Sequence, residues 1–217
     1  MVLLLFGPPG CGKGTQSRLL VDWLKVPAIS TGDMLRAEIR AGSDLGKAAQ
    51  STIASGGLVS DGLVNRILKA RIAEPDCSRG FILDGYPRTV EQAEFLDRTL
   101  EEMGLGRPVV LYFEVPRDAL VGRMSARRFC NNCGRTYNIL SVRPKRPGRC
   151  DEDGEPLVIR KDDREEVIRE RLRAYDDQTR PILAHYSDYH QIQGDRSPAY
   201  IFEALVGIIE PLMAKQT

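Results

Sequence analysis

The stretch GPPGCGKGT, residues 7–15, decides the fold and follows directly on the apolar run VLLLF, Val2–Phe6. An apolar run this short and continuous predicts a strand buried on both faces. Residues 14–24, GTQSRLLVDWL, place apolar side chains at helical spacing. Gly7-x-x-x-x-Gly12-Lys13 between a strand and a helix is the pattern of a phosphate-binding loop. Its glycines let backbone N–H groups converge on phosphate oxygens at the positive end of a helix.

The side chains in and near this loop indicate how phosphate and Mg²⁺ could be bound. Lys13 supplies a full positive charge that can follow a transferring phosphoryl group. Gly14 stands where a Ser or Thr usually ligates Mg²⁺, and Thr15 comes one place later. Asp84, at the end of a second apolar run, is therefore a candidate to hold Mg²⁺ through bound waters, although it could also be a plain turn residue.

The rest of the chain alternates predicted strands and helices. Further strands are expected at residues 81–83 and 108–115, and a last one near AYIF, residues 199–202, before a C-terminal helix. Helices are expected at 32–41, 61–72 and 89–103. This alternation predicts an α/β fold with a parallel β-sheet flanked by helices.

Composition excludes several classes of protein. Lys plus Arg number 31 and Asp plus Glu 30, so charge gives no general reason to expect nucleic-acid or membrane binding. No apolar run approaches the roughly 20 residues that span a bilayer. The start MVLLLF lacks the basic leader of a signal peptide, so we expect a cytoplasmic protein. The odd number of cysteines, 5, argues against a disulfide scaffold.

One segment interrupts the α/β pattern. Residues 117–149 hold nine basic residues and a single acid, Asp118, and about 129–159 reads as a small inserted domain. Cys130-x-x-Cys133 is followed by Cys150-x-x-Asp153, and two hooks of this spacing can close a tetrahedral zinc site. Asp151 or Glu152 could compete for the fourth place. A redox dithiol would leave Cys150 without a role.

Four motifs together resemble the adenylate kinase family. They are the loop GPPGCGKGT, the segment ISTGDMLR at 29–36, GFILDGYPRTVEQA at 80–93 with its Asp-Gly-Tyr-Pro-Arg core, and RKDDREEVIRERL at 160–172. The resemblance runs from about residue 2 to 210. It implies a P-loop kinase with a core domain (1–29, 63–121 and 165–217), a nucleoside monophosphate-binding domain (30–62) and a lid domain with a zinc site (122–164).

The resemblance also implies an activity. This is reversible, Mg-dependent phosphoryl transfer between ATP and AMP that gives two ADP, with a lid that closes over the phosphates. The planar fork of arginine suits such phosphates. The implied catalytic residues are Lys13, Arg88, Arg123, Arg127, Arg160 and Arg171. The implied nucleotide-binding residues add Gly10, Cys11, Gly12, Gly14, Thr15, Thr31, Arg36, Gly57, Leu58, Val59, Asp84, Gly85, Tyr86, Pro87, Gln92, Thr136, Tyr137 and Arg196.

Particular roles follow from the same resemblance. Arg36 and Arg88 match the residues that hold the AMP phosphate, and Arg123 matches the one that stacks on the ATP adenine. Asp153 matches a variant of the zinc-bearing forms, in which cysteine or aspartate is the fourth ligand. The inserted segment has too little apolar content to form a core of its own. We expect the zinc to be structural because it would supply the missing cross-link, which contributes about 10 kcal/mol in small peptides. A monomer is expected.

Two alternatives stay open at this point. A kinase for UMP or CMP would share most of these motifs, although Thr31 and Gln92 favour AMP. A zinc-ribbon module that binds nucleic acid would explain the basic segment, but Phe129 and Tyr137 are its only aromatic residues, a thin platform for stacking bases. We therefore expect ATP, AMP and ADP as the partners, with no nucleic acid and no membrane.

Overall fold

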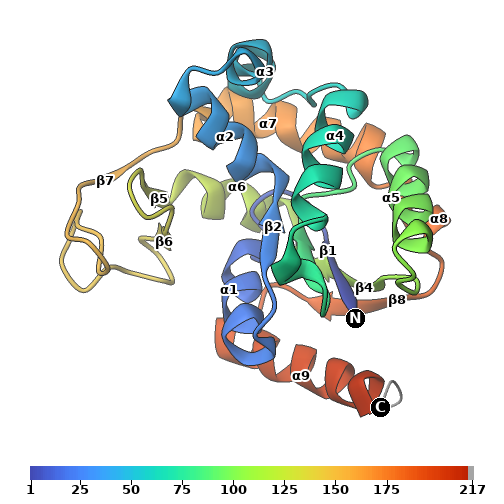
Figure 1. The fold of residues 1–217 in the computed structure, drawn as a ribbon. Helices are drawn as coiled ribbons and strands as arrows, with labels where there is room; N and C mark the ends of the chain where they lie inside the picture. Colours follow the sequence, from blue (N-terminus) through green and yellow to red (C-terminus); the bar gives the residue numbers. More distant parts are fainter. Residues whose placement is uncertain (215–217) are drawn as a thin grey trace.

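The computed structural model describes residues 1–214 and is built on a five-stranded parallel sheet (Figure 1). The strand order is β2-β3-β1-β4-β8. The strands are β1 Val2–Phe6, β2 Ala28–Ser30, β3 Phe81–Asp84, β4 Val109–Glu114 and β8 Tyr189–Gln193. The expected α/β architecture is thus confirmed.

Helices cover both faces of this sheet. They are α1 Lys13–Leu24, α2 Thr31–Ala41, α3 Asp44–Ser55, α4 Asp61–Ile72, α5 Val90–Glu102, α6 Arg117–Ser125, α7 Glu165–Ala174, α8 Ile182–His185 and α9 Pro198–Ala214, with short 3₁₀ turns at Pro75–Cys77 and Lys161–Asp163 and a π-helical turn at Tyr175–Thr179. None of the helices in this described part of the chain is long and apolar enough to cross a membrane.

The side chains of β1 divide the core into two halves. Val2, Leu4 and Phe6 belong to one buried cluster, together with residues of α4 and α5. Leu3 and Leu5 belong to the other, together with residues of α1, α7 and α9. Alternate residues of a strand point to opposite faces, so every position of β1 has to be apolar. This is the physical reason for the run VLLLF.

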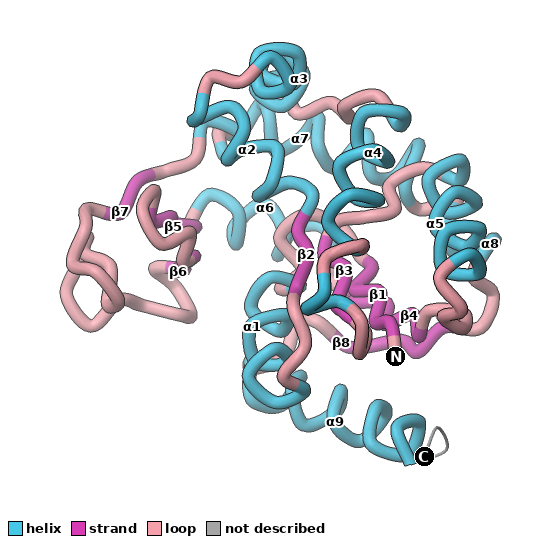
Figure 2. Tube along the Cα trace, viewed as in Figure 1, coloured by secondary structure: helices cyan, strands magenta, loops and turns pink. Residues whose placement is uncertain are grey.

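A small second sheet stands apart from the main one. It has the order β6-β5-β7, with β5 Arg127–Cys130, β6 Thr136–Asn138 and β7 Leu157–Val158, all antiparallel. Figure 2 shows that this region, at the left of the view, is mostly loop. Its buried cluster consists of Cys130, Tyr137 and Cys150. So small an apolar core cannot hold the segment together without another cross-link.

The prediction of one strand was wrong, and several elements were not predicted, including β2, α3, α6, α7 and β8. Residues 199–202, expected to form the last strand, lie in α9, and the last strand of the sheet is β8. Ile201, Leu205 and Ile209 are buried at helical spacing, a longer-range pattern that outweighs the local strand preference of AYIF. The three-residue β2 and the largely polar α3 gave no clear periodic signal.

Core packing can be tested at β3. The side chain of Leu83 is fully buried, so Leu83→Ala should lower the free energy of unfolding by about 2–5 kcal/mol because a cavity remains. Leu140, which is 66% exposed, is the matched control, and Leu140→Ala should change stability by less than about 0.5 kcal/mol. Urea unfolding followed by circular dichroism measures both. Equal effects would contradict this account of the core.

Candidate functional site

A cavity of about 890 Å³ opens where β1 and β3 end. Its walls come from the phosphate-binding loop, α2, α6, α7 and the small second sheet. A smaller cavity of about 50 Å³ adjoins it, between α2, the loop after α3, and the loop after β3. Ligands of open parallel sheets bind at the carboxyl ends of the strands, which is where both cavities lie.

The loop after β1 turns sharply into α1. Gly7 has φ +148°, and a Cβ there would come within 2.7 Å of the Phe113 carbonyl oxygen, so only glycine fits. The side chain of Lys13 folds back over the loop, where its Nζ donates to the carbonyl oxygens of Gly7 (2.7 Å) and Pro8 (2.9 Å). These acceptors are neutral, so anionic phosphate oxygens, which bind an ammonium group more strongly, can replace them.

Asp84 lies beside Gly14 at the floor of the cavity. A Cβ on Gly14 would be 3.4 Å from Asp84 Oδ2, so the carboxylate occupies the side of the loop on which a Ser or Thr at 14 would project. Burial raises the pKa of Asp84, and the charge of Lys13 opposes this rise. The arrangement leaves Asp84 as the carboxylate nearest to the position where the usual Mg²⁺ ligand is missing.

Nine arginines of the described residues 1–214 line the large cavity, and the six that the family resemblance singles out come from segments far apart in the chain. They are Arg36, Arg88, Arg123, Arg127, Arg160 and Arg171. Burial and the neighbouring arginine charges lower the pKa of Arg160 to about 9 and that of Arg171 to about 10. Positive charges that are buried and lie close together favour a polyanionic ligand, because such a ligand offsets both the desolvation of the charges and their mutual repulsion.

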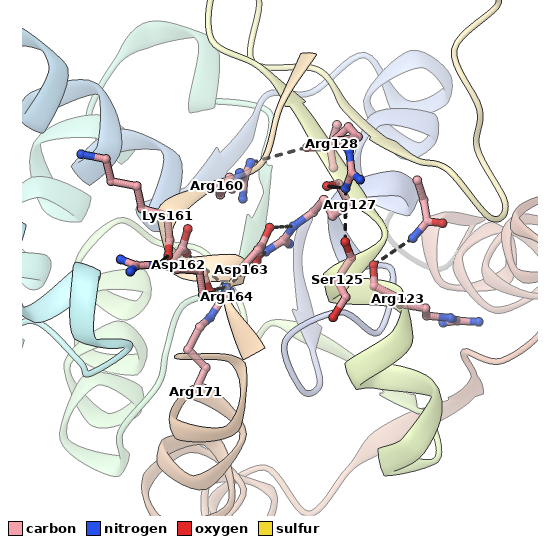
Figure 3. Close-up of polar contacts among 12 residues, drawn as sticks. Arg123, Ser125, Arg127, Arg128, Arg160, Lys161, Asp162, Asp163, Arg164 and Arg171 are labelled. Atoms are coloured by element: carbon pink, nitrogen blue, oxygen red, sulfur yellow. Dashed lines mark hydrogen bonds and ion pairs between the residues drawn. The ribbon is translucent and has the colours of Figure 1, made fainter. Parts of the chain in front are cut away.

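Three carboxylates pair with four of these six arginines, namely Arg36, Arg127, Arg160 and Arg171. Asp163, whose side chain is fully buried, accepts from Arg127 Nε at 2.7 Å and from Arg171 at 3.1 Å. Asp162 pairs with Arg171 at 3.1 Å. Figure 3 shows both carboxylates next to each other, with Arg127 and Arg171 directed at them. Asp33 in α2 pairs with Arg36 at 2.7 Å and approaches Arg160 at 3.5 Å.

None of these three acids was predicted from the sequence to be a site residue. The signal for two of them was present, because two aspartates follow Arg160 and Lys161 at the start of the stretch RKDD. Acidic residues in a site for phosphates are unfavourable if only their repulsion of the ligand is considered. Their role is to pair with the arginines, and the sequence does not show which arginines lie close to them.

The smaller cavity is lined by Thr31, Gly57, Val59, Arg88 and Gln92, among others. Gln92 is buried, and its amide is already engaged: Oε1 accepts from the backbone N–H of Arg88 at 2.7 Å, and Nε2 donates to Asp61 at 2.6 Å. One N–H and one lone pair of the amide remain.

The other residues singled out in the sequence lie as follows. Two residues, Leu58 and Gly85, line both cavities. The large cavity is also lined by Gly10, Cys11, Gly12, Lys13, Gly14, Thr15, Asp84, Pro87, Thr136, Tyr137 and Arg196. Tyr86 lines neither. Its ring is buried and its hydroxyl donates to Asn65 Oδ1 at 2.7 Å, so it packs beneath the site and contributes no wall. Tyr137 is also mostly buried, with its hydroxyl 3.4 Å from Cys150 Sγ.

A cluster of possible metal ligands lies in the small second sheet. The ligand atoms of Cys130, Cys133, Cys150 and Asp153 all lie within 4.8 Å of one another. Cys133 Sγ is 3.4 Å from Cys150 Sγ, and Cys130 Sγ is 3.3 Å from an Asp153 oxygen. Ligands about 2.3 Å from a tetrahedral zinc are roughly 3.8 Å apart, so this donor set fits zinc.

The two hooks of this cluster, residues 130–133 and 150–153, have the same backbone hydrogen bond. Gly134 donates its N–H to the carbonyl of Cys130 at 3.1 Å, and Gly154 donates to that of Cys150 at 3.0 Å, both glycines at positive φ. The competing acids are engaged elsewhere: Asp151 accepts from the backbone of Lys145, and Glu152 pairs with Arg135.

Comparisons with known proteins agree with this geometry. A family model described as "Adenylate kinase" matches residues 5–191. The chain is 49% identical to the adenylate kinase of Thermosipho melanesiensis over 186 residues, which is 86% of this chain and 87% of that protein. It is 44% identical to the adenylate kinase of Desulforudis audaxviator over 209 residues, 95% and 98% of the two chains. For the adenylate kinase of Anaeromyxobacter dehalogenans the identity is 46% over 188 residues, 87% and 88%.

The carboxylates make stability depend on acid pH. Burial raises the pKa of Asp162, but Arg171 and Arg36 outweigh it, so the net shift is downward. A group with a lowered folded pKa stabilises the fold fully above its unfolded pKa of about 3.9, and this contribution is lost as pH falls through the folded pKa. Asp162→Asn should therefore flatten the fall in the free energy of unfolding below about pH 4.

Urea unfolding of the parent and the variant at several pH values measures this slope. Asp44→Asn, which removes a fully exposed carboxylate, controls for the loss of one charge and should keep the parental slope. A slope below pH 4 that Asp162→Asn leaves unchanged would contradict the role given to this ion pair.

Proposed function

This chain belongs to the adenylate kinase family, and we propose how its residues share the transfer of a phosphoryl group from ATP to AMP. The protein catalyses the reversible conversion of ATP and AMP into two ADP. The observation that carries the assignment of roles is the convergence of Lys13 and six arginines on one cavity, with a second cavity beside it. Two nucleotides that face each other through their phosphates would use both cavities.

ATP is proposed to bind on the phosphate-binding loop. The N–H groups of residues 10–15 surround its phosphates, and Lys13 Nζ exchanges the carbonyl oxygens of Gly7 and Pro8 for phosphate oxygens. Arg123, which donates to the Gly194 carbonyl at 2.6 Å, and Arg196 in the neighbouring loop are proposed to hold the adenine. Mg²⁺ bound with ATP would supply further charge neutralisation, and Asp84 is proposed to hold it through water.

AMP is proposed to bind between α2 and the loop after β3. Arg36 and Arg88, which line both cavities, hold its phosphate at the border between them. Thr31, the backbone of residues 57–59 and the remaining donor and acceptor of Gln92 surround the ribose and base. Gln92 is fixed by Arg88 N–H and Asp61, so its free groups are oriented before the base arrives.

Transfer itself needs position and charge more than a proton shuttle. An AMP phosphate oxygen is already anionic at neutral pH, and it attacks the γ-phosphorus in line with the leaving ADP oxygen. Arg127, Arg160 and Arg171 are proposed to stabilise the charge of the transferring group. Their folded pKa values stay above neutral pH, so they remain cationic. Asp162 and Asp163 are proposed to keep Arg127 and Arg171 directed at this point before substrates bind, and Asp33 to do the same for Arg160.

Closing of the lid domain, residues 122–164, is proposed to exclude water, the competing acceptor of the phosphoryl group. Zinc held by Cys130, Cys133, Cys150 and Asp153 is proposed to stabilise this domain without taking part in catalysis, because the domain has almost no apolar core of its own. The core and AMP-binding domains are proposed at the boundaries given above. A cytoplasmic monomer is proposed from the family resemblance alone.

The AMP site is tested by Arg88→Ala. Loss of a charge-assisted donor to a phosphate should reduce kcat/KM for AMP by about 100-fold or more, while circular dichroism shows an unchanged fold. Arg66→Ala, on the exposed side of α4, is the control and should keep parental turnover. A coupled assay that follows ADP measures both. Near-normal turnover of Arg88→Ala would remove Arg88 from the site.

The metal site is tested by the choice of its fourth ligand. Asp153→Ala should release zinc during dialysis against a mild chelator and lower the melting temperature, whereas Asp153→Cys should retain it. Asp151→Ala is the control and should retain the metal, because that carboxylate caps a backbone N–H. Metal content per chain is measured by atomic emission. Loss from Asp151→Ala but retention by Asp153→Ala would reassign the ligand.

A further inference from the structure

Arg18 makes an unusual contact for a residue of α1. Its NH2 donates to the backbone carbonyl of Gly134 at 2.9 Å, across 116 positions of sequence. Arg18 lies in the helix that begins at the phosphate-binding loop, and Gly134 lies in the first metal hook. The contact joins the core to the distal part of the lid domain. Within residues 1–214, Arg18 forms no ion pair.

The position of the Gly134 carbonyl is set by the folded metal cluster. The N–H of Gly134 is bonded to the Cys130 carbonyl, and the N–H of Cys130 is bonded to the Arg135 carbonyl at 2.9 Å. The side chain of Arg135 pairs with Glu152 in the second hook. Gly134 is therefore the end of a rigid loop whose shape depends on both hooks.

This contact differs from the other polar links between the lid domain and the rest of the protein. Arg36 with Asp162, Arg160 with Asp33, and Arg171 with Asp162 and Asp163 all involve arginines that are proposed to bind phosphates, and Arg123, which donates to the Gly194 carbonyl, is proposed to hold the adenine. Arg18 lines the same cavity, but it has no proposed contact with a nucleotide, and its acceptor is a backbone carbonyl of the lid domain. The contact can therefore persist whether or not phosphates occupy the cavity.

We infer that Arg18 is a positioning residue that latches the lid domain shut by binding the carbonyl of the first metal hook. The inference rests on the role proposed above for the lid. A contact made only in the closed arrangement shifts the equilibrium towards it by its own free energy. Arg18 therefore raises the affinity for ligands that need the closed lid, and it slows opening, which limits turnover in many lidded enzymes.

Length-matched variants of the metal-loaded enzyme test this inference. Arg18→Met keeps the side-chain volume but cannot donate, and it should bind the bisubstrate analogue diadenosine pentaphosphate about fivefold more weakly, the loss expected for one hydrogen bond. The KM for ATP should rise by a similar factor while kcat stays equal or increases. Arg18→Lys, which can still donate, should recover part of the affinity. Arg66→Ala should match the parent throughout.

Hydrogen exchange gives a readout that does not depend on turnover. In the complex with diadenosine pentaphosphate, residues 130–138 should exchange faster in Arg18→Met than in the parent, with melting temperatures equal. Parental exchange and parental affinity in Arg18→Met would overturn the latch. So would a fall in kcat with unchanged exchange, which would indicate a defect elsewhere. Failure of the catalytic assignments would instead appear as turnover by Arg88→Ala, so the two outcomes are separate.

Discussion

The site depends on holding several positive charges close together in one cavity. Burial and mutual repulsion lower the pKa of Arg160 to about 9 and that of Arg171 to about 10, which indicates that the arrangement is unfavourable by itself. The rest of the fold makes it possible. The parallel sheet brings distant segments to one edge, and the first helix directs its positive end to the same place.

Asp162 and Asp163 reduce this cost without neutralising the site. They lie in the short turn Lys161–Asp163, between the lid domain and α7, and they reach Arg127 in β5, Arg171 in α7 and Arg36 in α2. One pair of neighbouring carboxylates thus links three parts of the molecule. A change in the position of any of these parts has to be accommodated at the same pair, because its ion pairs join α2 and α7 to β5.

The lid domain is stabilised in a different way from the core. The core buries two continuous apolar layers on either side of β1, whereas the small second sheet buries little beyond Cys130, Tyr137 and Cys150. With so small an apolar core, a metal bound by Cys130, Cys133, Cys150 and Asp153 would be needed to keep the two hooks as one rigid unit. Such rigidity would allow the proposed contact of Arg18 with Gly134 to act on the whole domain.

The sequence by itself indicated the phosphate-binding loop, the parallel α/β class and a cluster of candidate metal ligands. These follow from local spacing: glycines at fixed intervals, an apolar run too continuous for an exposed strand, and paired hooks. The six arginines and the choice of Asp153 as the fourth ligand came from the resemblance to the family motifs. Local spacing could not determine β8, because Tyr189–Gln193 becomes a strand only by pairing with β4. It also could not determine what Tyr86, Asp33, Asp162 and Asp163 do, nor the contact of Arg18. Those roles depend on which side chains meet across long separations in the chain, and only the tertiary structure brings them within bonding distance.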